Sequence, residues 1–142
     1  MPVIHVHDKQ FQPYISQEQI AGKIQEIAFA LEKDYSGKTP LFIAVLNGSF
    51  MFASDLFKAL NMPAEICFIK LASYKGTQSS GHIITSIGLD IDLFGRDVII
   101  LEDIIDTGKT MSQFLPQLLH QQPASLKICT LLHKPQAAIY PV

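Results

Sequence analysis

Three short, mainly apolar runs constrain the fold of this chain more than any other feature. They lie within Leu41–Leu46, Asp97–Glu102 and Ser125–Leu132, and Ala64–Leu71 and His82–Ser86 read as two further strands. The first run is uninterrupted, which is typical of a strand covered on both faces, as in parallel sheets. Segments with helical spacing separate several of these runs. We therefore predict an α/β fold with a mostly parallel, twisted sheet flanked by helices.

The segments between the runs carry the signals of helices. Ser16–Gln19 is a candidate capping box, and apolar residues recur behind it at helical spacing as far as Leu31. Helical periodicity returns over Phe50–Leu60. A helix is also predicted over Thr110–Gln121, although Pro116 should bend it or mark its real start. We expect one aromatic set, Phe50, Phe52 and Phe57, to pack in the core.

Size and composition indicate a single globular domain. The chain has 142 residues, of which 48% are hydrophobic and 17% charged, and its formal net charge is −2. We predict one domain over 1–142 with a core at about 16–135, and no nucleic-acid polymer as partner.

The longest apolar runs are too short to span a bilayer, and the first residues do not resemble a signal peptide, so a cytoplasmic location is expected. Cys67 and Cys129 lie in apolar runs and are predicted to be buried thiols, not a disulfide.

The stretch Val98–Met111 contains the residues that are most informative about a binding site. Its strand delivers two adjacent carboxylates, Glu102 and Asp103, and a third, Asp106, precedes a Thr-Gly-Lys-Thr turn. Carboxylates at an apolar strand end are costly unless cations or hydroxyls meet them. The turn offers backbone N–H groups, a glycine and two hydroxyls, which suit a phosphate. Carboxylates beside a phosphate cradle fit a phosphorylated sugar, whereas Glu-Asp alone is more often an ordinary acidic turn.

Other parts of the sequence exclude some kinds of site and suggest where the rest of this binding site lies. A nucleotide-triphosphatase loop would need a glycine where Asp103 stands, so that alternative is rejected. The five histidines form no metal-binding pattern. The polar segment 73–81 has almost nothing to bury and is suited to a closing lid, with an ordinary surface loop as the alternative. Loops at 47–49, 103–110 and 133–135 follow strands, so they should converge at the carboxyl ends of a parallel sheet.

A family resemblance becomes specific at these residues. Val98–Thr110 resembles the phosphoribosyl-pyrophosphate motif of type I phosphoribosyltransferases, and Glu-Asp-Ile-Ile-Asp-Thr-Gly-Lys-Thr resembles its hypoxanthine-guanine branch. Val45–Leu56 resembles the pyrophosphate loop and the helix after it. Ser73-Tyr74 with Ser79–Gly81 resembles the catalytic lid, and Leu131–Pro135 resembles the segment that carries a lysine to the purine. The resemblance covers roughly residues 40 to 135.

The resemblance implies a role for each matching residue. Glu102 and Asp103 would hold the ribose hydroxyls, directly or through magnesium, and Asp106 would act as general base or acid at N7 of the purine. The phosphoribosyl group would be bound by Glu102, Asp103, Asp106, Thr107, Gly108, Lys109 and Thr110. Asn47 and Gly48 would contact pyrophosphate, and the peptide between Leu46 and Asn47 can be cis. Ser73 and Tyr74 would belong to the lid, while Lys134 and Ile104 would contact the purine.

The implied activity is purine salvage. The chain would transfer the 5-phosphoribosyl group from phosphoribosyl pyrophosphate to hypoxanthine or guanine, with Mg²⁺ as cofactor, as a homodimer or homotetramer. The alternative is a non-catalytic phosphoribosyl-pyrophosphate-binding regulator of the same fold, which should carry a basic RNA surface. Two departures are notable: Asn47 replaces a basic residue common in the family, with Lys75 as a candidate substitute, and the family's C-terminal base-binding part is expected to be missing after Val142.

Overall fold

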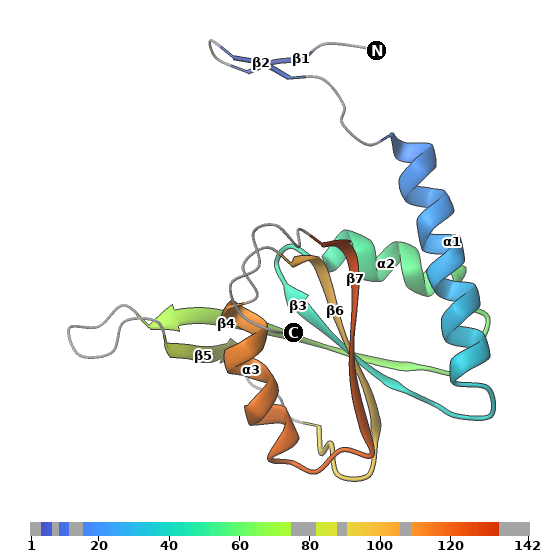
Figure 1. Cartoon of the computed structure of the whole chain (residues 1–142), viewed down its shortest axis with the longest axis vertical. Coiled ribbons are helices and arrows are strands. Elements are labelled where there is room, and N and C mark those ends of the chain that lie inside the picture. Colours follow the sequence, from blue (N-terminus) through green and yellow to red (C-terminus); the bar gives the residue numbers. More distant parts are fainter. Residues whose placement is uncertain are drawn as a thin grey trace.

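The computed structural model describes the backbone of residues 4–6, 9–11, 16–74, 82–87, 91–105 and 109–133, and the side chains of 16–70, 91–104 and 111–131. A five-stranded sheet forms the centre, and helices cover both of its faces (Figure 1). The elements follow in the order β1 (Ile4–Val6), β2 (Lys9–Phe11), α1 (Gln17–Asp34), β3 (Leu41–Leu46), α2 (Phe50–Ala59), β4 (Glu65–Tyr74), β5 (His82–Ile87), β6 (Asp97–Ile105), α3 (Lys109–Leu119) and β7 (Ser125–His133).

The strand order is β5-β4-β3-β6-β7, and every neighbouring pair is parallel except β4 with β5. This confirms the predicted α/β class and its mostly parallel sheet. Strands β1 and β2 pair antiparallel in a small sheet of their own. No helix in the described part of the chain is long and apolar enough to cross a membrane.

Alternation along the central strands builds a core on each face of the sheet. On one face, Phe42 and Ala44 of β3 and Ile99 and Leu101 of β6 pack with α1 and α2. On the opposite face, residues of the other parity pack with α3, which contributes Met111, Phe114 and Leu118. The buried residues of β3 and β6 that share this second face are Leu41, Ile43, Val45, Val98 and Ile100.

Helix α1 begins at the predicted capping box. The Ser16 hydroxyl accepts a hydrogen bond from the Gln19 backbone N–H at 3.1 Å, and the Gln19 side chain accepts one from the Ser16 N–H at 2.8 Å. Ile24, Ala28 and Leu31 are its buried stripe. The sequence therefore located both the start and the apolar face of this helix.

Two side-chain predictions needed correction or refinement. Phe52 is buried and Phe57 packs edge-on against Phe42, but Phe50, the first residue of α2, is 58% exposed. Cys67 and Cys129 are thiols, as predicted, although each is only partly buried. They pack on opposite faces of the sheet, and burial raises the pKa of Cys129 to about 11.

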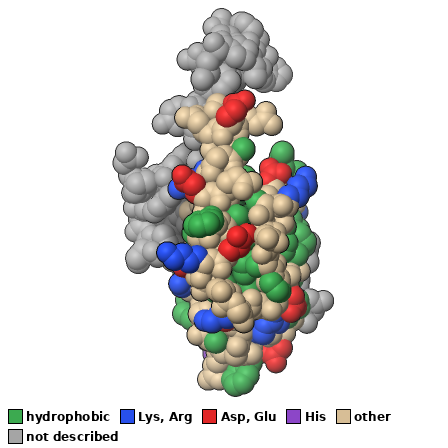
Figure 2. All heavy atoms as spheres, turned by 90° about the vertical axis from the view of Figure 1, so that its right-hand side faces the viewer, with side chains coloured by type: hydrophobic (Ala, Val, Ile, Leu, Met, Phe, Trp, Pro, Cys, Tyr) green, Lys and Arg blue, Asp and Glu red, His purple; other side chains and the backbone are tan. Residues whose placement is uncertain are grey.

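The face that carries α1 is chemically mixed (Figure 2). Acidic and basic side chains alternate on it, with hydrophobic side chains between them. Lys23 and Glu26 form one exposed ion pair there, at 3.6 Å. Such a surface suits an ordinary solvated helix.

Candidate active site

The side of the sheet to which successive strands are added reverses between β3 and β6. From β3 the chain proceeds through α2 to β4 on one side, whereas from β6 it proceeds through α3 to β7 on the other. Ligands of open α/β sheets bind at such a switch point, outside the carboxyl ends of the strands. The pairing of β3 with β6 ends at Ala44 and Leu101, but β3 stays paired with β4 as far as Leu46 and Lys70. The two central strands therefore separate where a site is expected.

The turn after β3 occupies this separation. Its peptide bond between Leu46 and Asn47 is cis, which confirms what the resemblance allowed. Gly48 lies against Asp103: a Cβ atom built on the glycine would come within 3.0 to 3.2 Å of the Asp103 carboxylate atoms. Of the predicted convergence of the loops at 47–49, 103–110 and 133–135, the approach of the first loop to Asp103 is observed, and a side chain at position 48 would fit only if the Asp103 carboxylate moved by a few tenths of an ångström.

The carboxylates themselves lie inside β6, not after it. The strand was predicted to end at Glu102 but continues to Ile105, because its later residues pair with β7. The alternation of a strand directs neighbouring residues to opposite faces, so Asp103 follows the parity of the α1/α2 face and Glu102 that of the α3 face. The Asp103 Oδ1 accepts a hydrogen bond from the Ile104 N–H at 2.9 Å.

Burial raises the pKa of one of these carboxyl groups, that of Glu102. The pKa of Glu102 is raised from 4.5 to about 7, first by desolvation and then by the nearby negative charge of Asp103. Two adjacent carboxylates in a partly buried site favour a cation or hydroxyl donors as partners. The binding of a sugar with free hydroxyls at these carboxylates stays a prediction.

Several predicted residues fall outside this described centre. Asp106, Thr107, Gly108, Lys134 and Lys75 lie outside the described residues. Lys109 and Thr110 form the first turn of α3, so this helix begins one residue earlier than predicted and contains Pro116 in its interior.

The expected lid and purine contacts are only partly described. Ser73 and Tyr74 belong to β4, where they pair with Ile83 and His82, so they extend a strand instead of beginning a loop. Ile104 lies on β6 opposite Leu132.

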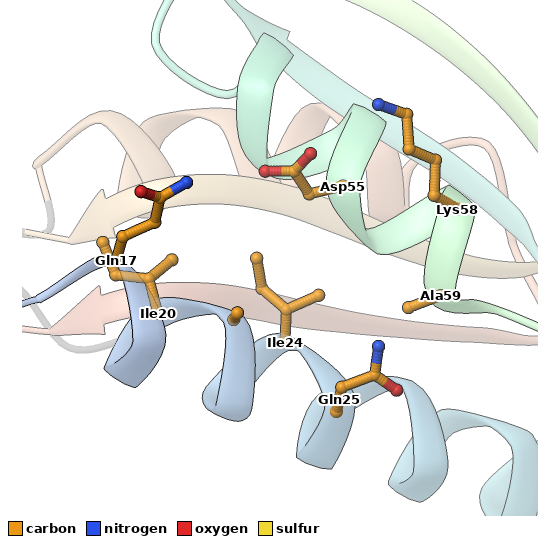
Figure 3. A pocket seen from close by; sticks show the side chains of 8 residues that line it. Gln17, Ile20, Ile24, Gln25, Asp55, Lys58 and Ala59 are labelled. Carbon is orange, nitrogen blue, oxygen red and sulfur yellow. The ribbon is translucent and has the colours of Figure 1, made fainter.

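A separate hollow lies between α1 and α2 (Figure 3). Ile20, Ile24 and Ala59 form its apolar part, Asp55 projects from α2 toward it, and Lys58 also lines it. Its volume is about 360 Å³. None of the predicted site residues lines it, so it is distinct from the centre at β3 and β6.

Comparisons with known proteins identify the family of the chain. Residues 14–141 match the family model described as "Phosphoribosyl transferase domain". A hypoxanthine-guanine phosphoribosyltransferase of Lactococcus lactis is 41% identical over 126 residues, which cover 88% of this chain and 68% of the relative. A hypoxanthine-guanine-xanthine phosphoribosyltransferase of Tritrichomonas foetus is 44% identical over 119 residues, covering 84% of this chain and 65% of the relative.

Solved structures show the same fold. A crystal structure of a hypoxanthine-guanine phosphoribosyltransferase from Bacillus anthracis superimposes with a TM-score of 0.85 at 36% identity, over 93% of this chain and 77% of that one. A hypoxanthine phosphoribosyltransferase from Staphylococcus aureus gives 0.85 at 33% identity, over 92% and 72%. The chain therefore spans about two thirds of the length of the two curated relatives and about three quarters of these structures.

Proposed function

Because this chain belongs to the phosphoribosyl transferase family, and within it to the hypoxanthine-guanine phosphoribosyltransferases, we propose that it catalyses purine salvage. It transfers the 5-phosphoribosyl group from phosphoribosyl pyrophosphate to hypoxanthine or guanine and yields IMP or GMP with pyrophosphate. The relatives' names support the reaction class. The observation that carries the proposal for this chain is the contact of Gly48 with Asp103 at the switch point. It joins the proposed pyrophosphate turn to the proposed ribose-binding carboxylates.

The pyrophosphate side of the site is the 46–49 turn and the start of α2. The first turn of α2 carries no acidic residue, and the side chain of Ser49 at its start makes no cap hydrogen bond. Uncapped N–H groups at a helix start stabilise an anion through hydrogen bonds and the helix dipole. Asn47 and Gly48 contact the leaving pyrophosphate in this proposal. Since Asn47 is neutral, its contribution is hydrogen bonding without charge.

The ribose side is the carboxylate pair. Glu102 and Asp103 accept hydrogen bonds from the 2′- and 3′-hydroxyls and hold the anomeric carbon in line with the leaving group. Their negative charge also stabilises the cation-like sugar that develops as the bond to pyrophosphate breaks. A ligand hydroxyl or cation near Glu102 favours its ionised form, because it offsets the desolvation and, to a lesser extent, the repulsion from Asp103 that raise the Glu102 pKa.

Magnesium fits this donor set. Within the described residues no group of three metal-binding side chains gathers, and the pair Glu102 and Asp103 offers hard carboxylate oxygens. Mg²⁺ is usually held by one or two carboxylates, with waters and phosphate oxygens completing its octahedron. When bound, the ion shares the charge of the departing pyrophosphate.

The purine side rests on the family resemblance. Asp106 takes or steers the proton of the purine at N7, and such general-base help contributes roughly 10²- to 10⁴-fold. The turn of Asp106 to Thr110 binds the 5′-phosphate, and Lys134 donates to the 6-oxo group beside Ile104. Ser73 and Tyr74, at the end of β4, lead into a lid that excludes water from the reacting centre.

We extend the proposal to the protein's organisation. The chain acts as one phosphoribosyltransferase domain over residues 1–142, assembles as a homodimer or homotetramer and works in the cytoplasm. Sedimentation velocity over a range of concentrations tests the assembly.

The activity is tested with a panel of bases. The chain is mixed with phosphoribosyl pyrophosphate, Mg²⁺ and each of hypoxanthine, guanine, xanthine and adenine, and nucleotide formation is followed by absorbance. Turnover is expected with the 6-oxopurines hypoxanthine and guanine, and none without the metal. The Ser54→Ala variant, altered at an exposed position of α2, is a matched control that should keep this activity. Turnover with none of the four bases contradicts the proposed function.

A further inference from the structure

We infer that Ser49 is a positioning residue for the pyrophosphate side of the site, an inference that rests on the proposed function. Ser49 is fully buried, with 0% of its surface exposed, and stands between the turn at Asn47 and the first residue of α2.

The hydroxyl of Ser49 turns back along the chain. It donates a hydrogen bond of 2.6 Å to the backbone carbonyl of Val45, four residues earlier. The Ser49 backbone N–H approaches the same oxygen at 3.3 Å, and the Phe50 N–H donates to the Asn47 carbonyl, also at 3.3 Å. These bonds close the turn from the last buried residue of β3 to the start of α2. Of the three, only the first is short.

The same geometry leaves the helix start without a side-chain cap. A capping serine accepts a hydrogen bond from the second or third N–H of its helix, with extended backbone angles. Ser49 has φ −87° and ψ 0° and makes no such bond. Because its hydroxyl oxygen accepts no hydrogen bond from the start of α2, it does not compete with an anion for those N–H groups. A helix-capping role would have opposed the proposed pyrophosphate contact.

The bond between Ser49 and Val45 also restrains the turn at Gly48, where the space beside Asp103 is small. A Cβ atom on Gly48 would lie 3.0 Å from the nearer Asp103 oxygen, so the backbone of the turn fits closely against the carboxylate. The separation of β3 from β6 after Ala44 and Leu101 leaves no ladder bonds between these strands at the turn. The Ser49–Val45 bond supplies a restraint at this point. Without it the turn can shift relative to Asp103.

Two matched variants test this role. Ser49→Ala removes the buried hydroxyl, and Ser54→Ala makes the same change at an exposed position of the same helix. Isothermal titration measures binding of inorganic pyrophosphate with Mg²⁺ and, separately, of IMP, which does not need the pyrophosphate turn. We expect the pyrophosphate Kd of Ser49→Ala to rise on the order of tenfold, with its IMP Kd within about twofold of the unaltered chain. Ser54→Ala should change neither. Equal weakening of both ligands, or an unchanged pyrophosphate Kd, overturns the inference.

A second measurement separates this inference from the proposed function. Amide hydrogen exchange of Phe50 reports the closed turn whether or not the chain is active. It should be on the order of tenfold faster in Ser49→Ala than in Ser54→Ala, and equal rates overturn the inference. If Ser49→Ala does not fold, Ser49→Cys, which keeps a weak donor, takes its place in both measurements. Absence of turnover by the unaltered chain contradicts the proposed function alone.

Discussion

Replacing Glu102 by glutamine should stabilise the folded chain at pH 8 in the absence of divalent cations, and should leave its stability almost unchanged at pH 4.5 and below. In the folded chain burial and the charge of Asp103 raise the pKa of Glu102 to about 7. In the unfolded chain the same group titrates near 4.5. Glutamine keeps the shape of the side chain and cannot ionise, so it removes the cost of a buried charge.

The magnitude follows from the two pKa values. Between pH 4.5 and 7 the folded state binds more protons at Glu102 than the unfolded state, so the stability of the unaltered chain falls as pH rises through this interval. The pKa values 4.5 and about 7 differ by about 2.5, and each pKa unit corresponds to ~1.4 kcal/mol, which sets an upper limit of ~3 kcal/mol. Glu102 is only partly buried, so solvent screening reduces this to ~1–2 kcal/mol.

Urea unfolding at pH 5 and pH 8 in EDTA measures the difference. Glu26→Gln, a change at an exposed carboxylate of α1, serves as the control, and its effect should be about the same at both pH values. The free-energy gain of Glu102→Gln over the unaltered chain should increase by about 1 kcal/mol or more from pH 5 to pH 8. A gain that is equal at both pH values, or a loss at pH 8, refutes the assignment of a raised pKa to Glu102.

The other predictions concern the two sides of the site. Asp106→Asn should lower turnover ~10²- to 10⁴-fold with near-normal affinity for phosphoribosyl pyrophosphate by titration, and equal loss of both contradicts the proposed role. Gly48→Ala places a methyl group 3.0 Å from the Asp103 carboxylate and should weaken pyrophosphate binding about tenfold in calorimetry. Gly22→Ala has open space around it in α1 and should instead raise stability by ~0.5–1 kcal/mol in urea unfolding. Asn47→Lys adds a cation to the pyrophosphate turn and should tighten binding of Mg²⁺-pyrophosphate several-fold; an unchanged Kd would show that the charge has no role there.

The sequence located the main elements because their signals are local. Leu41–Leu46 was predicted residue for residue, since a continuous apolar run between polar turns has few other interpretations. The capping box fixed the start of α1. The start of α2 at Phe50 was also correct, although the phenylalanine itself is exposed. Helical spacing identifies a stripe of core residues, but it does not tell whether the first residue of a helix is covered by its neighbours.

Features that depend on strand pairing could not be predicted in the same way. The extension of β6 to Ile105 results from pairing with β7, which lies beyond a helix in the sequence, and the extension of β4 to Tyr74 results from pairing with β5, the next strand along the chain. The close contact of Gly48 with Asp103 depends on the register of β3 and β6. The sequence did not single out Ser49, because its role depends on its burial and on its bond to Val45, which only the structure reveals.

Side chains alternate between the two faces of the sheet along β6, and this limits the insertions that the strand can accept. Insertion of one residue between Val98 and Leu101 would exchange the faces of all later residues, so that Asp103 would leave Gly48 and a neighbouring side chain would replace it. Insertion of two residues would restore the parity, at the cost of moving the carboxylates along the strand. The number of residues from the buried strand to the acidic pair is therefore constrained more tightly than the identity of any apolar residue within it. Homologous sequences should vary in the length of their connecting loops and keep this count constant.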